Sequence, residues 1–149
     1  MIKMKAATVF LDIDGVLNTK DSWAIPFQLN DKCIQAFCST LLKHVAEPRI
    51  ILTSSWKNGY SSIHENETPQ LKELRKKLGL YGINIDGRTK ALNHRMQEID
   101  EYIRTHEVST YAIIDDDPAE YTESYITKVT LINARTGFCE NQKIKWNRA

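Results

Sequence analysis

Several features that would assign the protein to a class directly are scarce or absent in this sequence. Lysine and arginine total 20 against 19 acidic residues, so no overall charge favours nucleic acid or an anionic membrane as a partner. The three cysteines lack metal-type spacing, which argues against a disulfide framework and favours a cytoplasmic location. The first apolar run stops at Asp12, and it is too short and too charged for a signal peptide or a membrane span. Neither G-x-x-x-x-G-K-[ST] nor G-x-G-x-x-G occurs, so nucleoside triphosphate and dinucleotide sites lack support.

The remaining composition is that of an ordinary globular protein, and its apolar periodicity alternates between strand and helix. With 42% hydrophobic and 26% charged residues in 149, we expect one domain over residues 1–149. Apolar, β-branched runs predict strands at about 7–12, 49–52, 83–85, 110–114 and 129–132. Three-and-four spacing and capping residues predict helices at about 31–45, 69–79 and 94–105. This alternation predicts an α/β fold, a three-layer Rossmann-like parallel sheet with helices on both faces and no separate cap domain.

Acidic and hydroxyl side chains follow three of the predicted strands. The stretch A-T-V-F-L-D-I-D-G-V-L ends its strand with Asp12 and Asp14, which share one side of an extended backbone because side chains alternate. R-I-I-L-T-S-S ends near Ser54, with Thr53 and Ser55 as substitutes if the register is shifted by one. A-I-I-D-D-D-P ends in Asp115 and Asp116. The carboxyl ends of parallel strands form the ligand crevice of such sheets, so these groups are expected to converge.

This constellation resembles the haloacid dehalogenase-like (HAD) hydrolase superfamily over nearly the whole chain. F-L-D-I-D-G-V-L matches its first motif, R-I-I-L-T-S-S-W-K its second and A-I-I-D-D-D-P its fourth. The third motif is a lysine or arginine near a helix start, for which Lys90 and Arg95 both qualify. The segments L-T-S-S-W-K and G-R-T-K are similar to a small capless branch found in RNA-repair proteins. The stretch from Arg95 resembles the R-G-x-E-I pattern of that branch, with Met96 in place of the glycine.

The resemblance implies roles for these residues. Asp12 is the expected nucleophile and Asp14 the general acid and base, while Ser54 and either Arg95 or Lys90 bind the phosphoryl group. The expected cofactor is Mg²⁺, held by Asp12, by the Asp14 backbone carbonyl and by Asp115 or Asp116. Mg²⁺ prefers such oxygen ligands and binds through few carboxylates together with substrate phosphate.

The predicted function is therefore a Mg²⁺-dependent phosphatase that acts through an aspartyl-phosphate. By this resemblance Asp14 fits a phosphatase or a phosphomutase, since the ATPases of the superfamily carry threonine there. The expected substrate is a phosphomonoester, with a nucleotide or nucleic acid end among the candidates, and a partner or second copy would serve as a lid. Trp23 in the loop of residues 18–29 either stacks on a substrate ring or packs under the loop. Lys57 is expected at the surface, with a contact to the substrate phosphate as the alternative.

Two other functions use similar residues. A phosphoacceptor signalling module of the receiver type also has acid clusters in an α/β fold, but its paired acids and acceptor follow strands in another order. A Mg²⁺-dependent nuclease would use the same carboxylates without covalent attack by Asp12.

Overall fold

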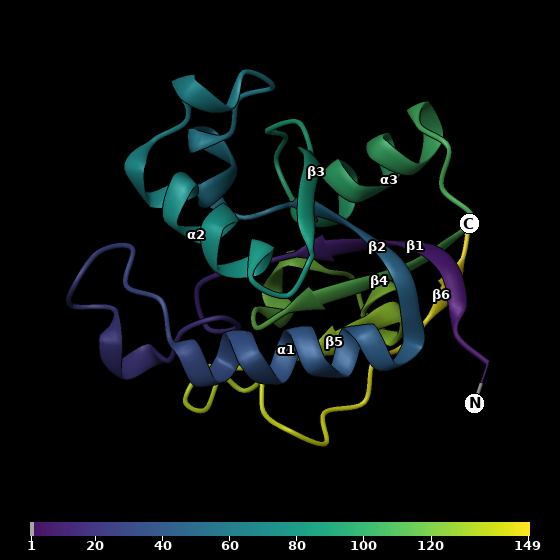
Figure 1. The fold of residues 1–149 in the computed structure, drawn as a ribbon. Helices are drawn as coiled ribbons and strands as arrows, with labels where there is room; N and C mark the ends of the chain where they lie inside the picture. The colour runs from purple at the N-terminus through teal and green to yellow at the C-terminus, as the bar shows by residue number, and fades with distance from the viewer. Residues whose placement is uncertain (1) are drawn as a thin grey trace.

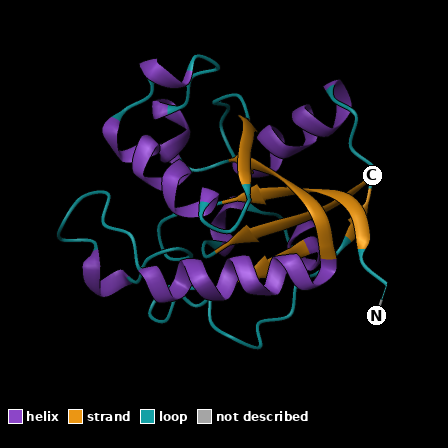
Figure 2. Ribbon diagram, in the orientation of Figure 1, coloured by secondary structure: helices purple, strands orange, loops and turns teal. Residues whose placement is uncertain are grey.

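The computed structural model describes residues 2–149, which form one predominantly parallel sheet (Figures 1 and 2). Five strands lie in the order β3-β2-β1-β4-β5 and pair in parallel, and a sixth strand pairs with β4 in the antiparallel sense. The strands are β1 (Met4–Leu11), β2 (Val45–Leu52), β3 (Asn84–Arg88), β4 (Thr110–Asp115), β5 (Val129–Leu131) and β6 (Asn147–Arg148). The α/β fold predicted from the sequence is confirmed.

Three α-helices connect the strands, and the first two begin directly after the predicted capping residues. They are α1 (Asp31–His44), α2 (Pro69–Gly79) and α3 (Arg95–Thr105). The Asn30 side chain accepts hydrogen bonds from two backbone N–H groups of the first turn of α1, and the Thr68 hydroxyl accepts one from the first turn of α2. Such side-chain oxygens replace the partners that the first helical N–H groups lack. Short 3₁₀ helices are η1 (Lys20–Ser22), η2 (Ser55–Gly59), η3 (His64–Asn66), η4 (Pro118–Glu120) and η5 (Tyr125–Lys128).

Each face of the sheet has its own apolar core, which makes the structure three-layered. On one face, α1 and α2 pack their leucines against residues such as Val9 and Ile50. On the other face, Phe10 and Ile51 pack against Ile99 of α3 and against tyrosines near η5. Neighbouring residues of β1 therefore belong to different cores, as the alternation of strand side chains requires. Among residues 2–149, the segments between strands hold helices and loops, and none forms a separate cap.

β2 begins earlier than the sequence predicted and β6 was not predicted, because both depend on hydrogen bonds from neighbouring strands. β2 begins at Val45, immediately after α1, and continues through Pro48, which was expected to end the helical unit. β3 pairs with β2 only from Arg49 onward, so Pro48 lies where β2 has a neighbour on one side. A proline is tolerated at such an edge position. β6 was not predicted, because its two residues depend on pairing with Thr110 and Tyr111 of β4.

The register of the central strands brings their carboxyl ends together. Leu11 lies opposite Leu52 of β2 and Ile114 of β4. The arrowheads of β1 and β4 point to the same edge of the sheet in Figure 1. The residues that follow these three positions therefore begin the loops of one crevice. None of the helices in residues 2–149 has the length and apolar character needed to span a membrane.

Candidate active site

Three carboxylates meet where β1 and β4 end. Asp12, Asp115 and Asp116 each offer an oxygen atom within 4.8 Å of the others. Asp12 and Asp115 are each only 1% exposed, and Asp116 is half-buried. Adjacent parallel strands produce this cluster, since Asp12 N–H donates to the Ile114 carbonyl at 3.0 Å. An open pocket of about 400 Å³ lies over the cluster.

Asp12 has an unusually unfavourable environment for a carboxylate. Its Oδ2 atom is buried without a hydrogen-bond partner, and its Oδ1 lies 3.6 Å from an Arg95 guanidinium nitrogen. Burial raises the pKa of the Asp12 carboxyl well above its usual range, the nearby Asp115 charge adds to this, and Arg95 opposes it. A buried polar atom without a partner costs free energy, so this oxygen is available to a cation or to a reacting group.

Asp115 differs from Asp12 because both of its oxygens are occupied. Arg95 Nη1 donates to Oδ1 at 2.7 Å and to Oδ2 at 2.8 Å. The Asp117 backbone N–H donates to Oδ1 at 3.0 Å, and the Tyr121 hydroxyl donates to Oδ2 at 2.7 Å. Burial and the Asp115 charge raise the pKa of Tyr121, which keeps this phenol protonated as a donor. Asp115 is thereby fixed as the counter-ion of Arg95.

Asp116 lies against the backbone at Gly15. Gly15 has a φ of +82°, and a side-chain carbon there would overlap the Asp116 carboxylate. Glycine adopts this conformation without steric cost, so the D-x-D-G turn lets the carboxylate approach the loop closely. Burial raises the pKa of Asp116. Its carboxylate lines the pocket together with Asp12 and Asp14.

One oxygen of Asp14 is oriented by two donors from other segments. Asn18 Nδ2 donates to Asp14 Oδ1 at 2.9 Å, and Trp56 Nε1 donates to the same atom at 3.2 Å. Asn18 is 2% exposed, and its Oδ1 accepts from the Gly15 N–H at 2.8 Å and from Trp23 Nε1 at 3.0 Å. Neither Asn18 nor the Trp56 indole was expected to have a role at this site. An asparagine directly after the apolar pair V-L is the one sequence signal for Asn18.

Ser54 is the hydroxyl that the second strand contributes. Its Oγ is buried without a partner, and Ser54 lines the same pocket as Asp12. Of the two alternatives left open by the sequence, Ser55 also lines this pocket, but Thr53 does not.

The two candidate cations of the third motif lie in different places. Arg95, the first residue of α3, reaches Asp115 and Asp12 and lines the pocket. The Lys90 side chain is 74% exposed, pairs with Glu101 at 3.5 Å, and lines a different hollow beside α3. The structure thus brings Arg95, and not Lys90, to the acid cluster.

The structure also shows where Lys57 and Trp23 lie. The expectation that Lys57 lies at the surface is wrong, because it is 4% exposed and bonded to Glu98. The pairing partner is distant in sequence, so no local pattern reveals it. Trp23 is 42% exposed at the rim of the pocket, and its indole N–H is tied to Asn18.

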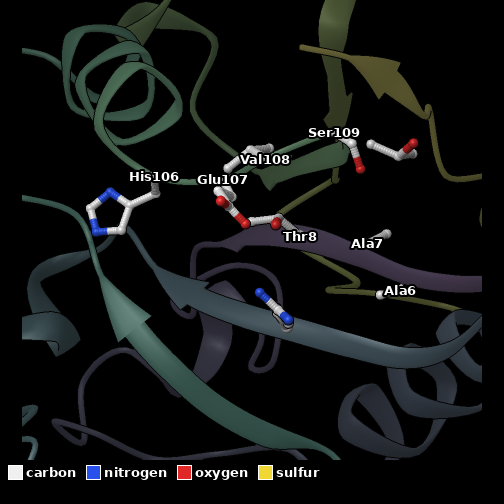
Figure 3. Close-up of a pocket in the computed structure, with 9 residues that line it drawn as sticks. Ala6, Ala7, Thr8, His106, Glu107, Val108 and Ser109 are labelled. Atoms are coloured by element: carbon white, nitrogen blue, oxygen red, sulfur yellow. The ribbon is translucent and has the colours of Figure 1, made fainter.

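A second hollow, of about 500 Å³, lies at the opposite end of the strands (Figure 3). Ala6, Ala7 and Thr8 of β1 line it, together with the segment from His106 to Thr110. Glu107 is the one carboxylate in its lining. This hollow lacks the convergent acids that distinguish the crevice at the carboxyl ends, which is therefore the candidate active site.

Comparison with known proteins identifies the family of the chain. Residues 8–142 match the family described as the HAD domain in Swiss Army Knife RNA repair proteins. No curated protein and no solved structure gave a significant match. The matched range contains all three strand ends and Arg95, so it spans the whole acid cluster. The chain belongs to the HAD-domain family of Swiss Army Knife RNA repair proteins, within a superfamily of hydrolases.

Proposed function

We propose that the protein is a Mg²⁺-dependent phosphomonoester hydrolase in which Asp12 is the nucleophile. One observation carries this proposal: Asp12 Oδ2 and Ser54 Oγ are both buried without a hydrogen-bond partner, and their residues line the same pocket. A phosphoryl group in the pocket would satisfy the hydroxyl, and a cation or phosphorus atom would satisfy the carboxylate.

The donor set fits a magnesium ion. Mg²⁺ holds oxygen ligands at about 2.0–2.1 Å, so opposite ligands lie about 4.2 Å apart. The three carboxylates have oxygens within 4.8 Å of one another, close to this span. Asp12 and Asp116 would hold the ion, because both oxygens of Asp115 already accept protein hydrogen bonds. When bound, the ion would supply positive charge that lets a carboxylate approach a phosphate.

Asp12 would attack phosphorus through a carboxylate oxygen, and the bond from phosphorus to the ester oxygen would break. Arg95 and Ser54 would hold the other phosphoryl oxygens, where preorganised donors stabilise the charge of the transition state. The product of this step is an aspartyl-phosphate, a recognised covalent intermediate. Water would then attack its phosphorus, which frees Asp12 and releases inorganic phosphate.

Asp14 would carry the proton in both steps. Its Oδ1 is bound by Asn18 and Trp56, which leaves Oδ2 to give a proton to the departing ester oxygen. The same atom would accept a proton from the attacking water. Such positioned proton transfer contributes typically about 10²–10⁴-fold to a rate.

The open pocket favours a bulky substrate. Trp23 is partly exposed at the rim beside Lys20, so an aromatic face and a cation are both near the phosphoryl position. Stacking on an aromatic side chain and pairing with a cation are the means by which proteins hold single-stranded nucleic acid. We therefore propose a phosphorylated nucleotide or nucleic acid end as the substrate, with a partner or a second copy as a lid.

A phosphate-release screen with Mg²⁺ tests the proposal, using small phosphoesters and oligonucleotides phosphorylated at either end. Asp12→Asn should abolish turnover and keep the melting temperature, while Ser54→Ala should retain more activity. Asp31→Asn, whose side chain is 81% exposed, is the matched control. Acid quench and mass spectrometry should find phosphate on Asp12. Robust release by Asp12→Asn would refute nucleophilic attack and favour a nuclease, and stable phosphorylation without turnover would favour the receiver-type alternative.

A further inference from the structure

A buried ion pair outside the pocket joins the segments that carry Ser54 and Arg95. Lys57 of η2 and Glu98 of α3 lie 3.0 Å apart, and their side chains are 5% and 8% exposed. Lys57 Nζ also donates to the Thr89 hydroxyl at 3.1 Å and to the Lys90 carbonyl at 3.0 Å. All three donors of the ammonium group are therefore used.

Glu98 is satisfied in the same complete way. Its second oxygen accepts the Leu92 backbone N–H at 2.8 Å. The pair thus connects η2, the loop that follows β3, and the first turns of α3. The Thr89 N–H, which donates to the Leu52 carbonyl at 3.0 Å, ties this loop to the end of β2 as well.

Both phosphate-binding candidates lie within one turn of this pair. The Lys57 N–H donates to the Ser54 carbonyl at 2.9 Å, so the lysine belongs to the turn that begins at Ser54. Arg95 lies three residues before Glu98 on α3, so the two residues are on one side of the helix. Arg95 extends to the acid cluster, and Glu98 extends to Lys57. Lys57 itself does not line the pocket.

We propose that Lys57 is a positioning residue whose bond to Glu98 sets the spacing between Ser54 and Arg95 for one phosphoryl group. This inference rests on the proposed function, because it assigns phosphate binding to these two residues. Stability alone does not require a buried ion pair, since apolar residues of similar volume are often as stabilising. Hydrogen bonds differ from apolar contacts in direction, and the four bonds of this pair restrain the turn and the helix in one arrangement.

The double variant Lys57→Met/Glu98→Leu separates positioning from stability. Each single variant leaves a buried charge without its partner and should lower the melting temperature. The double variant leaves no buried charge and should therefore melt at a higher temperature than either single variant. Its dissociation constant for inorganic phosphate, measured by calorimetry with MgCl₂ present, should rise about ten- to a hundredfold, as for a displaced binding group. Lys77→Met, which removes a surface ion pair with Asp31, should leave phosphate binding unchanged.

The outcomes distinguish this inference from the proposed function. A double variant with original phosphate affinity would overturn the positioning role, and so would an original protein that binds no phosphate. Weakened phosphate binding in a well-folded double variant supports the role, even if no phosphoester is hydrolysed. Absence of hydrolysis across the substrate screen would instead count against the proposed function. If the original protein hydrolyses a phosphoester, the KM of the double variant should exceed the KM of the Lys77→Met control.

Discussion

The Asn18 side chain is the most heavily bonded group beside the acid cluster, and its removal gives a quantitative test. Its amide makes four hydrogen bonds. The oxygen accepts from Gly15 and Trp23, and the nitrogen donates to Asp14 and to the Gln28 carbonyl. The bond to the Gly15 N–H is fully buried and the others are partly buried. Asn18→Ala would leave one buried donor unsatisfied and weaken three other contacts.

The magnitude follows from these contacts. An unsatisfied buried donor costs about 1–3 kcal/mol, and each ordinary hydrogen bond contributes about 0.5–1.5 kcal/mol before water replaces it. Since water reaches the partly buried groups, we expect Asn18→Ala to lower the free energy of unfolding by roughly 3 kcal/mol. For a chain of this size, that corresponds to a fall of roughly 10 °C in melting temperature. Turnover should also fall, because Asp14 loses one of the two donors that orient it.

Thermal and urea unfolding with phosphate release would measure both effects. Asn66→Ala, which removes an exposed asparagine side chain in η3, is the control and should change neither quantity. Asn18→Asp keeps the shape but puts an anion beside the Asp14 carboxylate, so it should be at least as damaging as alanine. An Asn18→Ala variant that melts within about 2 °C of the original protein and retains its turnover would refute a supporting role for this side chain.

Three further predictions concern the acids, the glycine turn and the thiols. Asp116→Asn should raise the Mg²⁺ concentration for half-maximal phosphate release about 10–100-fold. Asp115→Asn should mainly lower the melting temperature, because it removes the counter-ion of Arg95. A larger Mg²⁺ requirement in Asp115→Asn than in Asp116→Asn would contradict the assignment of ligands. Gly15→Ala should cost about 1–2 kcal/mol from its backbone conformation alone and also weaken Mg²⁺ by displacing Asp116. Gly79→Ala, with nothing within 4 Å of the added carbon, is the matched control and should not destabilise. Ellman's reagent should react quickly with Cys139 alone in the native protein, because burial raises the pKa of the other two thiols; fast reaction of all three would indicate a looser core.

Local sequence patterns predicted most elements well, since their causes are local. Helix α1 follows from an asparagine cap and a stripe of apolar residues, and both features act within a few turns. The strand ends at Asp12 and Asp115 follow from apolar runs that stop at an acid. The ends of strands at the sheet edge were less predictable. β6 and the first half of β2 owe their conformation to hydrogen bonds from a neighbouring strand, which a sequence window does not contain.

The sequence by itself determined which polar side chains follow the strands at the crevice. Asp12, Asp14 and Ser54 follow strands, so parallel pairing was sufficient to predict that they converge. The choice between Arg95 and Lys90 depended on which side chain reaches the cluster. Both precede or begin the same helix, and only the packing of α3 against the sheet directs Arg95 to Asp115.

The tertiary structure alone decided which groups support the site. No sequence pattern predicted the hydrogen bonds and the ion pair that hold the site residues. These are the bonds of Asn18 and Trp56 to Asp14, of Tyr121 to Asp115, and of Lys57 to Glu98. Most of these bonds join segments that are distant along the chain, and even the near ones depend on how a turn is folded back. A hydrogen bond depends on distances of a few tenths of an ångström. Such precision comes from the packed core, whereas composition and periodicity specify only which face of an element is buried.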